Sequence, residues 1–159
     1  MQKARFDRID RKILDTLQGD ARLTNQQLAE RVALSPSPCL RRVRALEEDG
    51  VIRQYVALLE PVKIGLSLLA FVTVKLEKRG KMPVEQFTRS VLAWPEVIAC
   101  YAMTGDMDYL MRVQVEDLDH YSRFIMEKLL KQPGVIDIKS NFVLERVKDT
   151  TALPLEQLP

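Results

Sequence analysis

An internal repeat in the second half of the chain is the feature that most limits its fold. Residues 92–98 and 130–136 share the pattern L-x-x-P-x-V-I at an offset of 38 residues, and the same offset aligns Phe71 with Tyr109. In each copy, apolar residues alternate along one stretch and then recur at helical spacing, after which the chain returns as a strand. Each copy is therefore predicted to form a strand, a helix and a second strand.

Two copies in tandem predict a ferredoxin-like (ACT-like) domain of the α+β class. The order β-α-β-β-α-β gives a four-stranded antiparallel sheet with two helices on one face, and we expect this domain to span residues 66–148. The other sheet face would carry Leu69, Phe71 and Leu110, a larger apolar patch than a small monomer usually exposes. We therefore expect two copies to stack their sheets in a homodimer.

The first part of the chain is predicted to form three short helices. Asp7 can cap the first, and Thr24 with Gln27 forms a capping box at the start of the second. The third follows after a tight connection, with Ser35 as its N-cap and Pro36 at its first helical position. Three short helices, the last two closely joined, are typical of a helix-turn-helix unit.

The third helix, over residues 35–50, has the residue order of a helix that reads DNA. Cys39, Val43 and Leu46 share one side and should face a core, whereas the opposite side is polar and basic. Its arginines precede its acidic residues, which is the reverse of what the helix dipole favours. For this helix alone, a solvated basic face is an equal alternative. The helix-turn-helix context favours insertion into a DNA major groove, where arginine recognises guanine.

Residues 51–59 look like a strand, which would serve as a wing or linker with Arg53 placed for a phosphate. Pro61, Lys63 and Gly65 then mark a hinge, so the DNA-binding domain is expected to cover residues 1–60. The residues predicted to bind DNA are Thr24, Asn25, Ser35, Ser37, Pro38, Arg41, Arg42, Arg44 and Arg53. The tail, residues 149–159, fits either an arm laid on a neighbour or a frayed end.

The loop over residues 103–109, between the two repeats, has more polar and acidic residues than a hairpin turn requires. Gly105 and Asp106 suit such a turn, but the turn does not explain Thr104 or a second acid at Asp108. Backbone N–H groups around a glycine can hold a carboxylate, while either aspartate can meet an ammonium group. The loop is therefore predicted to bind a free amino acid.

Composition sets the class of protein. The chain has 159 residues, of which 47% are hydrophobic and 29% charged, as is usual for globular proteins. It contains neither an apolar run of the roughly 20 residues that span a bilayer nor an N-terminal secretory segment, so we expect a cytoplasmic location.

A net charge of +2 means that any positive patch is local. Cys39 and Cys100 lie among apolar neighbours, which indicates buried thiols and neither a disulfide nor a zinc site.

Three motifs make the chain resemble the Lrp/AsnC (leucine-responsive, feast/famine) family of bacterial and archaeal transcription factors. They are DRIDRKIL, LSPSPCLRRVRALEEDGVI and TGDMDYL, the last at the family's glycine-aspartate loop. The resemblance covers nearly the whole chain and is closer to the leucine-responsive branch. It implies an N-terminal winged helix-turn-helix and a C-terminal amino-acid-sensing domain that dimerises, with dimers often associating into octamers.

The same resemblance implies the position of the ligand. Family effectors bind between subunits near the central loop, which here implies Ala102, Thr104, Gly105, Asp106 and Asp108, with Phe142 and Val143 as walls. The expected protein is a nucleoid-associated regulator of transcription that binds double-stranded DNA and responds to a small amino acid. Leucine or methionine is favoured by the branch, and a coupling of about 1–3 kcal/mol would suffice. No cofactor or metal is expected.

Two other classes remain as alternatives. Siroheme decarboxylases share this two-domain architecture, but acid-base chemistry would have to use His120, the only histidine, or the weak pair Asp106 and Asp108. A sensor domain that binds a protein partner would not need the arginines of the third helix. The sequence therefore favours a regulator over an enzyme or a protein-binding module.

Overall fold

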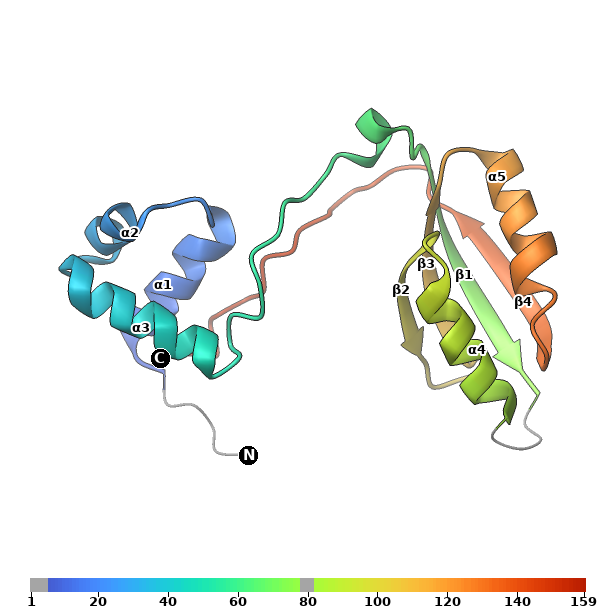
Figure 1. Cartoon of the computed structure of the whole chain (residues 1–159), viewed down its shortest axis with the longest axis horizontal. Helices are drawn as coiled ribbons and strands as arrows, with labels where there is room; N and C mark the ends of the chain where they lie inside the picture. Colours follow the sequence, from blue (N-terminus) through green and yellow to red (C-terminus); the bar gives the residue numbers. More distant parts are fainter. Residues whose placement is uncertain (1–5, 78–81) are drawn as a thin grey trace. The chain divides into compact units, whose positions relative to one another are not determined.

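The structure, a computed structural model, describes residues 6–77 and 82–159. The chain divides into two compact units, which are Met1–Leu58 together with Lys148–Pro159, and Leu59–Val147. Each unit has its own cluster of buried apolar side chains. The C-terminal tail thus belongs to the same unit as the N-terminal helices (Figure 1).

The first unit contains three helices, α1 (Arg8–Gly19), α2 (Asn25–Val32) and α3 (Pro36–Glu48). The predicted capping residues of the first two are confirmed, because the side chains of Asp7 and Thr24 both accept backbone N–H bonds in complete capping boxes. Ser35 precedes α3 as predicted, but its side chain makes no capping hydrogen bond. Ala33 ends α2 with a left-handed backbone, φ 59°, which makes the tight connection to α3.

The core of the first unit joins all three helices and the tail. Its buried members include Ile13 of α1, Val32 of α2 and Cys39 of α3. Leu155 and Leu158 of the tail pack against the same cluster. Neither placement that the sequence left open for the tail, an arm on a neighbour or a frayed end, is observed, because the tail packs on the chain's own helices.

The prediction of a strand over residues 51–59 is wrong. The backbone leaves α3 with Val51 and Ile52 both donating to the Leu46 carbonyl, and then runs on without joining any sheet among the described residues. A strand needs a hydrogen-bonded neighbour, and this segment finds none within the described part of one copy. A short 3-10 helix, η1 (Pro61–Ile64), follows.

The second unit is built on a four-stranded antiparallel sheet with the order β2-β3-β1-β4. Its strands and helices are β1 (Leu68–Leu76), α4 (Met82–Ala93), β2 (Val97–Ala102), β3 (Tyr109–Val115), α5 (Leu118–Arg123), the π-helix η2 (Phe124–Leu129) and β4 (Val135–Phe142). Both α4 and α5 cover the same face of the sheet (Figure 1). The predicted ferredoxin-like order is therefore confirmed.

The two sheet faces differ in their cover. On one face, the central strands bury side chains such as Val72 and Met111 against Phe87 and Phe124, and the Trp94 ring meets both phenylalanines edge to face. On the other face Phe71 remains 36% exposed and Leu110 is half-buried, whereas Leu69 is only 9% exposed. The uncovered apolar face that the repeat predicts is thus present at Phe71 and in part at Leu110, but the prediction is wrong for Leu69, which is already buried within the described residues of one copy.

Two details of the second repeat were not predicted. The second helix of the repeat continues from α5 as the π-helix η2, and β4 ends at Phe142, before the expected domain boundary at residue 148. After β4, the chain makes one further backbone bond to the sheet, from the Val143 N–H to the Leu69 carbonyl. In residues 6–77 and 82–159, every helix is too short or too polar to cross a membrane.

Candidate DNA-reading helix and amino-acid site

Helix α3 presents a polar side to solvent. Its other side is fixed in the core by Cys39 and Leu46, which are 0% and 5% exposed. Ser37, Arg41 and Arg44 lie at positions i, i+4 and i+7, so they share one face of the helix, and all three are exposed. Ser35 is exposed just before the helix, while Pro38 is half-buried in its first turn.

Arg42 is held differently from its neighbours on α3. Its Nη1 atom donates to Asp7 Oδ2 at 2.8 Å and to Asp10 Oδ1 at 2.7 Å. The hydrogen bonds that Arg42 donates to both carboxylates raise the pKa of Arg42, and the pKa of Asp7 is lowered mainly by the hydrogen bond from the backbone N–H of Asp10. Arg42 therefore joins α3 to the first turn of α1, a role that sequence reasoning missed.

The two residues predicted to bind DNA from α2 also have partners inside the unit. Thr24 exchanges hydrogen bonds with Gln27 in the capping box. Asn25 Nδ2 donates to the carbonyl of Pro36 at 2.9 Å, which ties the start of α2 to the start of α3. Arg53 is exposed on the extended segment that follows α3.

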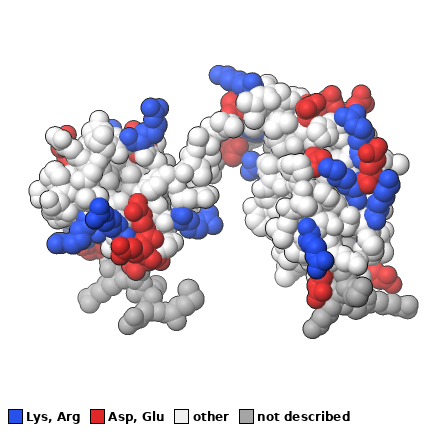
Figure 2. Space-filling model, in the orientation of Figure 1, with Lys and Arg blue, Asp and Glu red and all other residues white. Residues whose placement is uncertain are grey.

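Charges of both signs are interspersed on this unit. Figure 2 shows clusters of Lys and Arg beside clusters of Asp and Glu, in agreement with the small net charge. The positive surface available to a polyanion is therefore local and includes the exposed arginines of α3.

The loop between β2 and β3 is shaped by Gly105 and Asp108. Gly105 has φ 116°, a backbone conformation that other residues rarely adopt. Asp108 Oδ2 accepts the Leu76 N–H at 2.8 Å, and the Asp108 N–H donates to the Val74 carbonyl at 3.0 Å. Asp108 thus fixes the loop to the end of β1, whereas Asp106 is exposed.

The structure brings only part of the predicted ligand site together. Ala102, Thr104, Gly105 and Asp106 are all exposed at the loop, beside the Val74 end of β1. Phe142 instead pairs with Ala70, four residues back along β1, a separation of about 13 Å at the rise of a strand. Its ring packs on Tyr121 with centroids 5.0 Å apart. Within one copy, the loop and Phe142 therefore lie beside different parts of β1.

The histidine considered for the enzyme alternative lies beside Glu96 and Lys128. His120 Nε2 lies 3.7 Å from Glu96 Oε1, and Lys128 Nζ lies 2.6 Å from the same oxygen, on the helical side of the sheet. In residues 6–77 and 82–159, no group of three or more His, Cys, Asp or Glu side chains could hold a metal ion.

A helix-turn-helix unit joined to a ferredoxin-like unit is the architecture expected of one class of protein, the DNA-binding regulator with its own ligand domain. Residues 6–53 match the winged helix-turn-helix DNA-binding family model, and residues 69–153 match the Lrp/AsnC ligand binding domain. The chain belongs to the Lrp/AsnC family of transcription regulators, as its motifs predict.

Relatives of known identity align over nearly the whole chain. The DNA-binding transcriptional activator DecR of Escherichia coli K12 is 45% identical, over 95% of this chain and 99% of its own. The leucine-responsive regulatory protein of the same organism is 43% identical, over 95% of this chain and 92% of its own. A transcriptional regulator of Neisseria meningitidis, solved in complex with L-Met, has 49% identity and a TM-score of 0.93, over 96% of this chain and 98% of that chain. These relatives are regulators and not enzymes.

Proposed function

We propose that this protein regulates transcription by reading operator DNA with α3, and that a small amino acid bound at the loop over residues 103–109 controls this binding. The observation that carries the proposal is the shared exposed face of Ser37, Arg41 and Arg44 on a helix whose opposite face is buried. The DNA-binding activator DecR and the leucine-responsive regulatory protein support the same function.

In this proposal, the predicted DNA-binding residues have three different tasks. Arg41 and Arg44 contact base edges in the major groove, where arginine pairs with guanine, and the exposed Arg53 contacts phosphate. Ser35, Ser37 and Pro38 position the first turn against the duplex. Thr24, Asn25 and Arg42 act mainly inside the protein, because their side chains already have partners in the unit.

The ligand proposed for the loop is a free α-amino acid. Backbone N–H groups beside Gly105 would hold its carboxylate and Asp106 would accept its ammonium group. Asp108 supports the loop through the N–H of Leu76. Methionine is the first candidate, because the regulator with 49% identity was solved with L-Met, and leucine is the second.

The assembly proposed is a homodimer that stacks the uncovered sheet faces and associates further into octamers. Exposed apolar residues on this unit include Phe71 and Tyr101, which are 36% and 57% exposed. Burying them would remove apolar surface from water at roughly 25 cal/mol per Å². We further propose that the ligand lies between copies, with Phe142 and Val143 of one copy near the loop of another, and that the protein acts in the cytoplasm on the nucleoid.

The DNA proposal is tested with operators obtained by selecting genomic fragments that the protein binds. Arg41→Ala should weaken operator binding by about 1–3 kcal/mol and relax base preference at one position, whereas Arg53→Ala should weaken all sequences equally and lower the salt dependence. Arg123→Ala, an exposed change on α5, is the control. Unchanged affinity and base preference in Arg41→Ala would show that α3 is not the reader.

The ligand proposal is tested by calorimetry against all twenty amino acids. Methionine or leucine should bind the parent protein, and Asp106→Asn should weaken that binding by at least about tenfold, because a charge-assisted hydrogen bond to the ammonium group is lost. Asp119→Asn, at an exposed aspartate on α5, should leave binding unchanged. A parent protein that binds none of the twenty would remove the amino acid from the proposal.

A further inference from the structure

The C-terminal tail is bound to α1 by a pair of reciprocal hydrogen bonds. The Leu153 N–H donates to Gln18 Oε1 at 2.6 Å, and Gln18 Nε2 donates back to the Leu153 carbonyl at 3.1 Å. The primary amide of Gln18 thus pairs with the tail backbone as a neighbouring strand would. This contact needs the backbone of Leu153 and not its side chain, which is 71% exposed.

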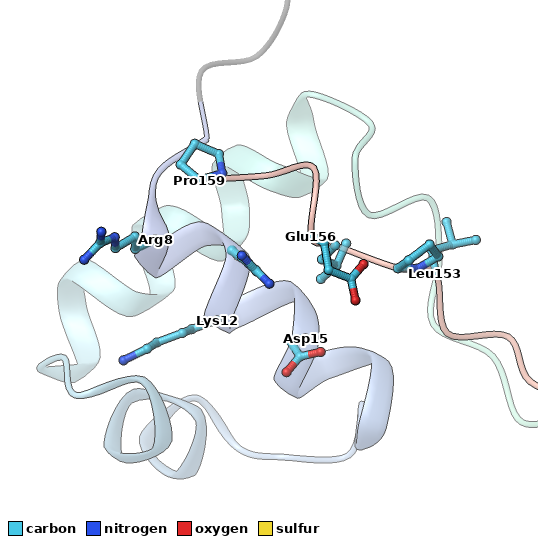
Figure 3. Close-up of a pocket in the computed structure, with 9 residues that line it drawn as sticks. Arg8, Lys12, Asp15, Leu153, Glu156 and Pro159 are labelled. Atoms are coloured by element: carbon cyan, nitrogen blue, oxygen red, sulfur yellow. The ribbon is translucent and has the colours of Figure 1, made fainter.

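Further along, the tail is held by both polar and apolar contacts. Arg11 Nη1 donates to the Leu158 carbonyl at 3.3 Å, and the side chains of Leu155 and Leu158 pack on the core that the three helices share. Figure 3 shows Leu153, Glu156 and Pro159 following one another along α1. A pocket of about 410 Å³ lies between this part of the tail and α1.

This docking gives the helical unit a second connection to the sheet unit, a chain segment whose end is held to α1 by noncovalent contacts. The first connection runs from Glu48 to Leu68, about twenty residues that reach at most about 72 Å when extended. The second runs from Phe142, the end of β4, to Leu153, about eleven residues that reach at most about 40 Å. While the tail is docked, the shorter connection limits how far α1 can move from β4.

We infer that residues 153–158, the docking strap, restrict the positions available to the DNA-reading helices by holding them through this second connection. The inference rests on the proposed function, because its consequence concerns two reading helices that bind one DNA. Two half-sites must match the separation and the rotation of the two helices. When one of two restricted reading helices is bound, the other should meet a correctly spaced half-site at a high effective concentration, which raises the affinity for the whole operator. This gain in affinity should disappear when the spacing of the half-sites changes.

The test uses a selected operator with two half-sites, the same operator with about half a helical turn inserted between them, and a single half-site. The strap variant combines Leu155→Ala with Leu158→Ala, and Gln18→Ala is a second, independent variant. The control is Leu153→Ala, which makes the same change at an exposed leucine of the tail and keeps the backbone bonds to Gln18.

The measured quantity is the ratio of affinities for the native and the respaced operator. In the parent and in Leu153→Ala this ratio should be large, and in both strap variants it should fall by at least about fivefold, because released reading helices adapt to the new spacing. Affinity for the single half-site should change less than about twofold. An unchanged ratio overturns the inference, and so does an equal loss on all three DNAs, which would mean that the tail only stabilises the helical unit.

Hydrogen exchange separates failure of the inference from failure of the proposed function. The Leu153 amide should be protected in the parent and exchange faster in Gln18→Ala, because its acceptor is removed. A parent protein that binds no DNA refutes the proposed function. Protection of the Leu153 amide then still tests whether the docking strap is bound to α1. Absence of protection at Leu153 in the parent would overturn the docking itself.

Discussion

Asp7 connects two helices through one carboxylate. Its Oδ1 atom accepts the N–H groups of Ile9 and Asp10 at the start of α1, and its Oδ2 atom accepts from Arg42 on α3. Asp7→Ala should therefore lower the free energy of unfolding by about 1–2 kcal/mol, since a lost N-cap alone costs about 1 kcal/mol. The measurement is urea unfolding of the full chain.

Asp7→Ser is the matched variant for this prediction. Serine can still cap α1 but removes the charge that faces Arg42, so it should recover most of the stability lost in Asp7→Ala. A serine variant as unstable as the alanine variant would mean that the pairing with Arg42, and not the cap, supplies the stability.

The ion pair between Glu96 and Lys128 leads to a second prediction about a single residue. Burial alone would raise the pKa of Glu96, but the hydrogen bond from Lys128 and its charge lower that pKa below the ordinary value. Because the folded pKa lies below the unfolded one, the pair stabilises the fold above about pH 4.3 and loses this effect as pH falls through the folded pKa. Lys128→Gln should cost about 1–2 kcal/mol at pH 7.

The pH dependence distinguishes charge from packing at Glu96. The difference in free energy of unfolding between the parent and Lys128→Gln should shrink at acidic pH, as Glu96 becomes protonated in both proteins. Chemical unfolding at a series of pH values measures it. A difference that persists unchanged in acid would assign the effect of Lys128 to its aliphatic stem.

At the scale of elements, the turn before β4 is fitted closely to the start of α4. Gly134 has φ 81°, and a Cβ atom there would lie 2.5 Å from Cβ of Pro83. Gly134→Ala should therefore lower the free energy of unfolding by about 2–3 kcal/mol, through backbone strain and the steric clash. Gly19→Ala is the control, at the last residue of α1 with open space around it, and it should be neutral or slightly stabilising. Thermal unfolding measures the stability of both variants.

Local signals made the helices and most of the sheet predictable. Asp7 and Thr24 cap helices through residues two or three positions away, so these starts can be found in the sequence. The alternation in the repeat located β1 and β3 because one sheet face is buried. The extended segment after α3 was mistaken for a strand, since a suitable residue pattern does not provide a neighbouring strand.

The candidate site was predictable only where its residues are near in sequence. Gly105 and Asp106 lie at one exposed turn, as expected. The bonds from Leu76 to Asp108 and from Arg42 to Asp7 connect residues more than thirty positions apart. No pattern of spacing reports contacts of that kind, and the register that separates Phe142 from the loop is also set by long-range pairing.

At the scale of the whole molecule, the uncovered sheet face predicts self-association. Phe71 and Tyr101 are exposed apolar residues of β1 and β2, and the double change Phe71→Lys and Tyr101→Lys should produce monomers, because it would bury two unpaired charges in the proposed interface. Sedimentation at micromolar concentration measures this. Leu92→Lys, on α4 at a leucine that is 84% exposed, should leave the parent's assembly intact. A double variant that still sediments as the parent does would place the interface elsewhere.

The extended segment after α3 has a consequence for how long a chain survives before it assembles. Residues 53–59 are all exposed and lie outside every helix and sheet of the described residues, which is the backbone form that endopeptidases accept. The segment includes Leu58 and Leu59, which are both at least 66% exposed. A protease could therefore cleave an unassembled chain between its two units. We expect unassembled copies to be degraded faster than assembled ones, so that turnover itself would favour complete regulators over isolated chains.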